Sequence, residues 1–263
     1  MDFGERYLQP APRGAGAMAN GAGRFLADLT WSEAERLLTP ERVVLLPLGA
    51  SAKEHGHHLR LDNDARLADH LARAVAAASD VVVLPTLGYH HYPAFAVYPG
   101  STSLRPETAR DLVVDIVRSI AAYGPRRFYI LNTGISTVGP LADAATRLAT
   151  DGVTMRWTDW KALLAPLETQ FCSQPRGSHA DEAETSLMLH LEPSRVEMKA
   201  AARELAEWKP GGFQRDATKP GTFSPSGVWG DATLATAEKG RALFEGIVAG
   251  LLSDVAALRN APN

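Results

Sequence analysis

The sequence has few features of secreted, membrane or nucleic-acid-binding proteins. Cys172 is its only cysteine, which excludes a disulfide within the chain and fits a reducing compartment. No apolar run approaches the roughly 18 residues that a membrane span needs, and the first residues lack the apolar segment of a secretory signal. The formal net charge of -3 provides no basic surface for nucleic acid. We therefore expect a cytoplasmic protein that binds neither membranes nor nucleic acid.

Length and composition are those of an ordinary globular protein. The chain has 263 residues, of which 45% are hydrophobic and 22% charged, enough to bury a substantial core. We find neither an internal repeat nor a linker. Residues 1–29 are rich in Gly, Ala and Pro and predict a leader that is flexible or contacts another subunit. Residues 30–263 are expected to form a single domain.

Short apolar segments alternate with amphipathic ones through the first half of the chain. We predict strands at 43–48, 81–87, 127–131 and 154–157. We predict helices that begin after Thr30, with Glu33 completing a capping box, and at 65–78, 106–123 (capped by Ser103), 140–149, 180–191 and 235–258. This alternation predicts an α/β fold with a mostly parallel sheet. The Gly- and Pro-rich stretch 210–230 reads as a long loop that is functional or forms an interface.

The end of the first predicted strand is dense in side chains that bind metals. After 43–48 the chain has three histidines and three acids within eleven residues: Glu54, His55, His57, His58, Asp62 and Asp64. In an open α/β sheet, active sites lie beyond the carboxyl ends of the strands. Glu54, His55 and Asp64 can bind a divalent cation of the zinc or manganese type, and an aspartate can bridge two ions. The alternative is a solvated polar loop.

Two further groups are candidates for the site. His179 precedes a predicted helix, where it can act as a general acid or base or cap the helix. Glu184, one turn into that helix, can be a ligand, a carboxylate that supports a ligand, or a solvated residue. His90 and His91 lie between two tyrosines, where they line a pocket or an interface or supply an imidazole to the site. Trp229 is the tryptophan best placed to meet a substrate.

Several motifs together resemble the creatininase family of metal-dependent amidohydrolases. Leu-Pro-Leu-Gly at 46–49 is followed by Glu-His-Gly-His-His-Leu at 54–59 and Asp-Asn-Asp at 62–64. Further segments match in the family's order, at 98–104, 124–127 with Asn132 and Gly134, 179–187, 227–231 and 235–240. The resemblance spans roughly residues 30–252, nearly the whole chain.

The resemblance implies a three-layer α/β/α sandwich and a homo-oligomer, often a hexamer. It also implies a two-metal centre that activates water to open a cyclic amide or a related C–N bond. His55 and Asp64 match a family ligand and its bridging aspartate. His179 matches the histidine on the side of the substrate and of proton transfer. Tyr98 opens one of the matching segments and is predicted, with His90, His91 and Trp229, to contact the substrate.

The chain departs from the family pattern at three positions. Lys53 stands two residues before His55, where the family has a glutamate. Ile135 and Thr137 stand where the family's Asn-Gly-His-x-Glu supplies two more ligands. Neither isoleucine nor a neutral threonine replaces an imidazole or a carboxylate as a strong metal ligand.

From these observations we expect a metal-dependent hydrolase with one divalent ion, zinc or manganese, at Glu54, His55 and Asp64. His179 and Glu184 are the expected catalytic residues. The substrate is predicted to be a small cyclic amide, a formamide or a related molecule, and not creatinine. Two alternatives remain open: a metal-free hydrolase or isomerase that uses His179 on a sugar-like or lactone substrate, and a non-catalytic oligomeric binding protein.

Overall fold

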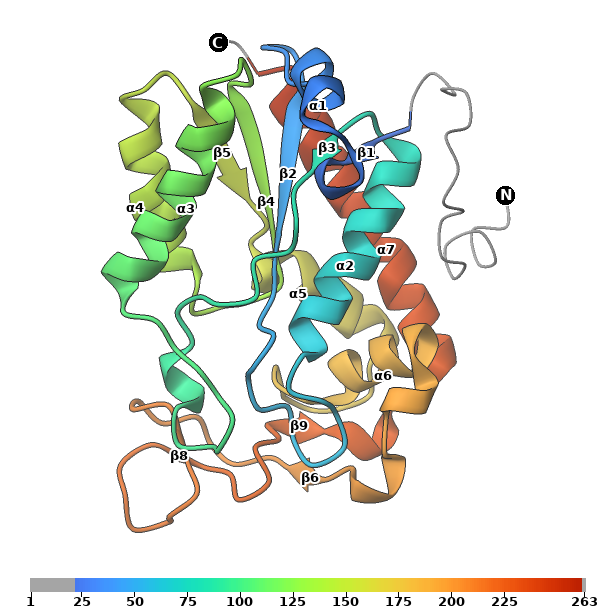
Figure 1. Ribbon diagram of the computed structural model, residues 1–263. Coiled ribbons are helices and arrows are strands. Elements are labelled where there is room, and N and C mark those ends of the chain that lie inside the picture. The colour runs from blue at the N-terminus through green and yellow to red at the C-terminus, as the bar shows by residue number, and fades with distance from the viewer. Residues whose placement is uncertain (1–21, 262–263) are drawn as a thin grey trace.

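A five-stranded parallel sheet forms the centre of the molecule (Figure 1). The structure is a computed structural model that describes residues 22–261. The strands run in the order β1-β3-β2-β4-β5, and every neighbouring pair is parallel. Their bounds are β1 Arg24–Phe25, β2 Val43–Leu48, β3 Val82–Val83, β4 Arg127–Asn132 and β5 Thr154–Trp157.

Helices cover both faces of this sheet, which confirms the predicted three-layer α/β/α sandwich (Figure 1). α3 and α4 lie on one face; α2, α5 and α7 lie on the other, with α6 packed on α7. The helices are α1 Trp31–Leu37, α2 Asn63–Ala78, α3 Pro106–Ala121, α4 Val138–Ala149, α5 Trp160–Phe171, α6 Glu182–Leu191 and α7 Ala237–Arg259. Among the described residues, no helix combines the length and the apolar character needed to cross a membrane.

Strand β2 shows how the sequence builds two cores. Side chains alternate across a strand, so Val43 and Leu45 join the core beneath α2 and α7, while Val44 and Leu46 join the core beneath α3 and α4. All six residues of β2 are buried because the strand lies in the middle of the sheet. The carboxyl end of β2 is thereby fixed at the centre of one sheet edge.

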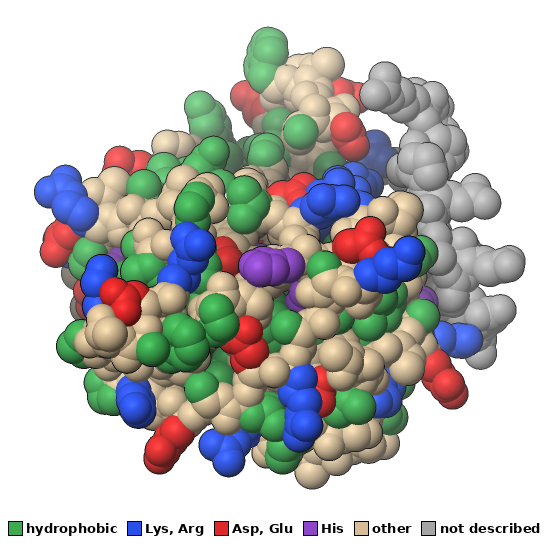
Figure 2. Space-filling view, turned by 90° about the horizontal axis from the view of Figure 1, so that it is seen from below, with side chains coloured by type: hydrophobic (Ala, Val, Ile, Leu, Met, Phe, Trp, Pro, Cys, Tyr) green, Lys and Arg blue, Asp and Glu red, His purple; other side chains and the backbone are tan. Residues whose placement is uncertain are grey.

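Short elements complete the fold on the side of the strand carboxyl ends. β6 pairs with β9, and β7 with β8, within the predicted loop region and its surroundings. These strands are β6 Arg203–Glu204, β7 Phe213–Gln214, β8 Thr222–Phe223 and β9 Gly230–Asp231, and the 3₁₀ turns are Leu26–Asp28, Pro93–Phe95, Pro193–Arg195, Met198–Ala200 and Ala232–Leu234. From this side, acidic and basic side chains are interspersed among hydrophobic ones, without a large patch of one sign (Figure 2).

The second predicted strand, 81–87, was too long. Ladder pairing is limited to Val82 and Val83, because Pro85 has no N–H to donate and bends the chain out of the ladder. The chain returns to β2 only at Leu87, which forms an isolated bridge with Leu48.

One predicted helix cap and one predicted helix start were wrong, while α3 begins at Pro106 as predicted. The N-cap of α3 is Arg105, and the Ser103 hydroxyl instead accepts a hydrogen bond from the Tyr92 N–H at 2.9 Å. α6 begins at Glu182 rather than Ala180, because Ala180 has a left-handed backbone with φ 49°. Helix α5 was missed, although Asp159 caps it by accepting from the Ala162 N–H.

Most of the predicted leader, residues 1–21, lies outside the described residues. Its last part contributes Arg24 and Phe25 to strand β1 at the edge of the sheet. The domain boundary after residue 29 stays a prediction.

Candidate active site

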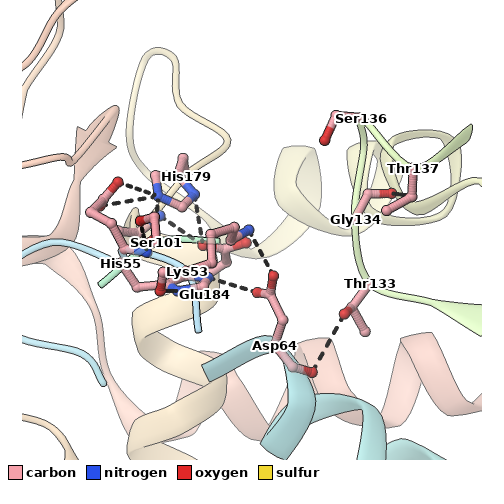
Figure 3. Close-up of polar contacts among 12 residues, drawn as sticks. Lys53, His55, Asp64, Ser101, Thr133, Gly134, Ser136, Thr137, His179 and Glu184 are labelled. Carbon is pink, nitrogen blue, oxygen red and sulfur yellow. Dashed lines mark hydrogen bonds and ion pairs between the residues drawn. The ribbon is translucent and has the colours of Figure 1, made fainter. Parts of the chain in front are cut away.

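The candidate site lies where the loop after β2 meets the beginnings of α2 and α6 (Figure 3). Lys53 and His55 come from the loop, Asp64 from the first turn of α2, and His179 from the segment before α6. Gly49 permits this arrangement, since a Cβ there would lie 2.2 Å from the Asp64 carbonyl oxygen. The close approach of loop and helix brings Asp64 beside His55.

His55 is fully buried between two hydrogen-bond acceptors. Its Nδ1 lies 3.0 Å from the carbonyl oxygen of Lys53, and its Nε2 lies 2.6 Å from Asp64 Oδ1. A carbonyl only accepts, so Nδ1 carries the proton. Nε2 then either carries a second proton or binds a cation. Burial disfavours the charged ring, but the Asp64 carboxylate outweighs it and raises the pKa of His55.

His179 is oriented by Glu54. Its Nε2–H donates to the Glu54 carbonyl oxygen at 3.1 Å and faces the Glu54 carboxylate at 3.2 Å. This leaves Nδ1 directed to the other side, 3.8 Å from Glu184 Oε2. Burial acts to raise the pKa of Glu54, but His179 outweighs it and holds this pKa below its ordinary value.

The turn before α6 fixes Glu184. Its Oε2 accepts a hydrogen bond of 2.7 Å from the N–H of Ala180, the residue with the left-handed backbone. Asp181 caps the helix by accepting from the N–H of Ala183 and of Glu184. Burial, and then the nearby Glu184 charge, raise the pKa of both Asp181 and Glu168 to about 7. Acidic side chains are therefore gathered around Glu184 in a buried environment.

His55, His179 and Glu184 fit one divalent metal ion. Each offers one ligand atom within 4.8 Å of the others, and all three are buried. The second ring nitrogen of each histidine is held by a backbone or carboxylate oxygen, as is usual for metal-binding histidines. The carboxyl groups of Glu54, Asp64 and Glu184 are all buried and outnumber the single buried amine of Lys53. One divalent cation would balance that excess, because buried charges need partners.

A second ion does not fit these residues. The Lys53 ammonium lies 2.7 Å from Asp64 Oδ2, on the oxygen that His55 does not contact. Ile135 offers no ligand atom. The Thr137 hydroxyl donates to Asn132 Oδ1 at 2.8 Å and lies apart from the cluster (Figure 3). Of the predicted ligands, only His55 belongs to the group that fits an ion, whereas Glu54 and Asp64 lie beside that group.

A cavity of about 200 Å³ opens onto this cluster, and its lining is mainly apolar. Aromatic side chains from the 88–104 loop and from the long loop meet there. The lining residues are Lys53, Tyr92, Ala94, Phe95, Thr133, Gly134, Ile135, Ser136, Trp160, Ser178, His179, Glu184, Trp208 and Phe213. Phe95, Trp208 and Phe213 were not predicted from the sequence; the composition of 210–230 was the only signal, and it pointed to a functional loop containing Phe213.

The four predicted substrate-binding residues do not line the cavity. His90 is buried with both ring nitrogens lacking a partner among the described residues. His91 donates to the Leu104 carbonyl, Tyr98 to the Ser224 carbonyl and Trp229 to the Ala206 carbonyl. In this structure, the last three tie neighbouring loops together.

Fold and site together define a class: α/β proteins with a candidate metal centre at the carboxyl edge of a parallel sheet. The sequence model of the creatininase family, described as creatinine amidohydrolase, matches residues 27–255. The chain belongs to the creatininase family. This confirms the resemblance and places the chain among the hydrolases of that family.

Two relatives and one solved structure illustrate the relationship. The chain is 31% identical to the mycofactocin precursor peptide peptidase of Mycobacterium ulcerans, over 88% of this chain and 91% of that protein. It is 28% identical to the creatinine amidohydrolase of Pseudomonas putida, over 86% and 94%. A solved structure described as creatininase Mn superposes with a TM-score of 0.77 at 25% identity, covering 91% of this chain and 100% of that one.

Proposed function

We propose that this protein hydrolyses an amide C–N bond with water activated at a single divalent ion. The observation that carries the proposal is the convergence of three buried side chains, His55, His179 and Glu184, of which His179 and Glu184 line the cavity. The two relatives, a peptidase and an amidohydrolase by name, support an amide substrate.

The protein's own residues would prepare this chemistry. Glu54 holds the His179 ring so that Nδ1 faces Glu184, and the Ala180 N–H holds the Glu184 carboxylate. The aromatic lining excludes water from the cluster and favours a small group with a flat or apolar face. A divalent ion, when bound, lowers the pKa of a bound water to about 7 and polarises a carbonyl. We infer that the substrate is a small cyclic amide, a formamide or a short peptide.

A second candidate function follows from the contact between His179 and Glu54. A histidine paired with a carboxylate can transfer protons without a metal, and His179 lines the cavity. In this case a second proton on His55 would offset part of the excess of buried carboxyl groups, in line with its raised pKa. The substrate would be a lactone or a sugar-like molecule.

The two candidates differ in their response to metal removal. We would strip the purified protein with EDTA, reload it with Mn²⁺ or Zn²⁺, and count bound ions by mass spectrometry. Hydrolysis of a panel of cyclic amides, formamides, short peptides and lactones would be followed in parallel. We expect one ion per chain, and amide hydrolysis that is lost on stripping and regained on reloading.

Variants would locate the activity. His55→Ala removes a ligand and should lower both ion binding and hydrolysis at least about 100-fold. The exposed neighbour His57 provides the matched control, since His57→Gln should change neither. Hydrolysis that survives complete stripping would favour the metal-free candidate. A protein that binds no ion and cleaves none of the panel would overturn both.

A further inference from the structure

Lys53 is a buried lysine at the floor of the cavity. Only 4% of its surface is exposed, and lysine is almost never buried this deeply unless it is paired. Its partner is Asp64, with Nζ 2.7 Å from Oδ2. The Phe95 ring lies on another side, with its centroid 4.6 Å from Nζ. The Asp64 carboxylate and the face of the Phe95 ring thus hold the ammonium in place beside the cavity.

Asp64 contacts two different side chains, one through each of its carboxylate oxygens. Oδ1 contacts His55 Nε2 at 2.6 Å, and Oδ2 contacts the Lys53 ammonium at 2.7 Å. By the resemblance, the matching aspartate of the family bridges two ions through its two oxygens, and the family has a glutamate, a possible ligand, at the position of Lys53. Here the second oxygen of Asp64 meets an ammonium belonging to the chain itself.

At two further positions where the family has metal ligands, this chain has side chains that do not replace them. Ile135 faces the cavity with an aliphatic side chain, and the Thr137 hydroxyl is engaged by Asn132. Three substitutions, at positions 53, 135 and 137, therefore remove ligands from the same centre. Only the change at 53 also adds a positive charge.

We propose that the Lys53 ammonium replaces one of the two metal ions of the creatininase centre and restricts this protein to a single ion. The proposal rests on the proposed function only for the nature of the remaining ion. Lysine has three N–H groups; one meets Asp64, and the cavity beside Nζ leaves room for a substrate oxygen. The ammonium is thereby placed to donate a hydrogen bond to the carbonyl of a bound amide.

Counting bound ions in variants of Lys53 tests this proposal. Lys53→Glu restores the family's residue and replaces the ammonium with a carboxylate, so Asp64 and the new carboxylate can hold a further cation. We expect isothermal titration with Mn²⁺ to show one equivalent for the parent and for Lys53→Arg, and two for Lys53→Glu. The exposed Lys199 supplies a matched control, because Lys199→Met should behave as the parent.

A second measurement covers a Lys53→Glu protein that does not fold. In Lys53→Met the Asp64 carboxylate keeps His55 on Oδ1 but loses its partner on Oδ2. The melting temperature should therefore fall, and saturating Mn²⁺ should raise it more than it raises that of the parent. Adding Asp64→Asn should abolish the extra Mn²⁺ response, because the second cation then has no bridging carboxylate.

The outcomes separate this proposal from the proposed function. Two ions in the parent, or unchanged stoichiometry in a folded Lys53→Glu and no extra Mn²⁺ response in Lys53→Met, would overturn the role of Lys53. A parent that binds no ion while Lys53→Glu binds one would uphold the role of Lys53 and reject the metal-dependent function.

Discussion

At the scale of single residues, the candidate site depends on which ring nitrogen each histidine leaves available. The His55 Nδ1–H donates a hydrogen bond to the Lys53 carbonyl oxygen, and the His179 Nε2–H faces the Glu54 carboxylate. The remaining nitrogens, Nε2 of one and Nδ1 of the other, are then directed at Asp64 and Glu184. The two histidines thus use opposite nitrogens, which follows from their different backbone surroundings.

Part of this could be predicted from the sequence. The short spacing between His55 and Asp64 and the strand before them predicted that the two residues lie at one sheet edge. The pairing of Lys53 with Asp64 could not be predicted. It depends on a loop in which Lys53, Glu54 and His55 are all buried, whereas an extended backbone would alternate them.

His90 offers a prediction about acid stability. Burial, and then His91, lower the pKa of His90 to about 4, so the folded protein keeps this ring neutral. The unfolded chain takes up a proton below about pH 6.5, and folding stability therefore falls as the pH drops from about 6.5 towards 4. At pH 5 the His90 contribution to this loss is about 2 kcal/mol.

Urea unfolding of the parent and of His90→Gln at pH 7 and pH 5 checks this. The loss of unfolding free energy between the two pH values should be about 2 kcal/mol smaller in the variant. The exposed His57 is the comparison, and His57→Gln should lose as much as the parent. Equal losses in His90→Gln and the parent would show that His90 titrates normally.

At the scale of secondary-structure elements, continuous sequence patterns predicted the bounds of strands well. Patterns that a proline or an unusual backbone interrupts predicted them poorly. β2 and β5 have the bounds that were predicted, 43–48 and 154–157. The strand at 81–87 was overestimated because Pro85 breaks the ladder. The start of α6 was misplaced because nothing in the sequence marks Ala180 as left-handed. That backbone is imposed by tertiary contacts, which a local pattern does not contain.

Two helical glycines should respond to alanine in opposite ways. A Cβ on Gly240 in α7 would lie 1.8 Å from the Ser186 carbonyl oxygen of α6, whereas a Cβ on the exposed Gly139 of α4 would meet nothing within 4 Å. Gly240→Ala should destabilise the protein by about 1–3 kcal/mol or more. Gly139→Ala should stabilise it by about 0.5 kcal/mol, because alanine loses less conformational entropy in a helix.

Thermal and urea unfolding of the two variants measure both effects under the same conditions. A stable Gly240→Ala protein would mean that α6 and α7 can move apart without cost. That result would also contradict the rigid placement of Glu184 on α6.

At the scale of the whole molecule, the site joins segments that are far apart in the chain. The loop after β2, the turn before α6 and the long loop at 210–230 meet at one sheet edge (Figure 1). Gly227 of the long loop has φ 90° and approaches the Glu54 carboxylate so closely that a Cβ would lie 2.1 Å from Oε1. The α/β class and the parallel sheet followed from the alternation of elements, whereas the strand order was not predicted. The aromatic cavity was not predicted either, because it depends on how three loops pack.

The predicted homo-oligomer remains a prediction at this scale. We expect light scattering at micromolar concentration to give a mass several times the 28.2 kDa of one chain, with a hexamer as the form that the family resemblance implies. A mass of one chain across the concentrations tested would contradict it.

Helix α7 packs against α6, α5, α2, β4 and β2, and Leu243, Ile247 and Leu251 fill the core on that side of the sheet. The ribosome makes α7 after every other described element. Until it emerges, α6 lacks the helix against which it packs most extensively, and the turn before α6 that carries His179 lacks this support. A core is complete only when all its layers are present, so the candidate site takes its final shape late in synthesis. A nascent chain that has not yet reached residue 237 therefore contains the residues of the candidate site without the packing that brings them together.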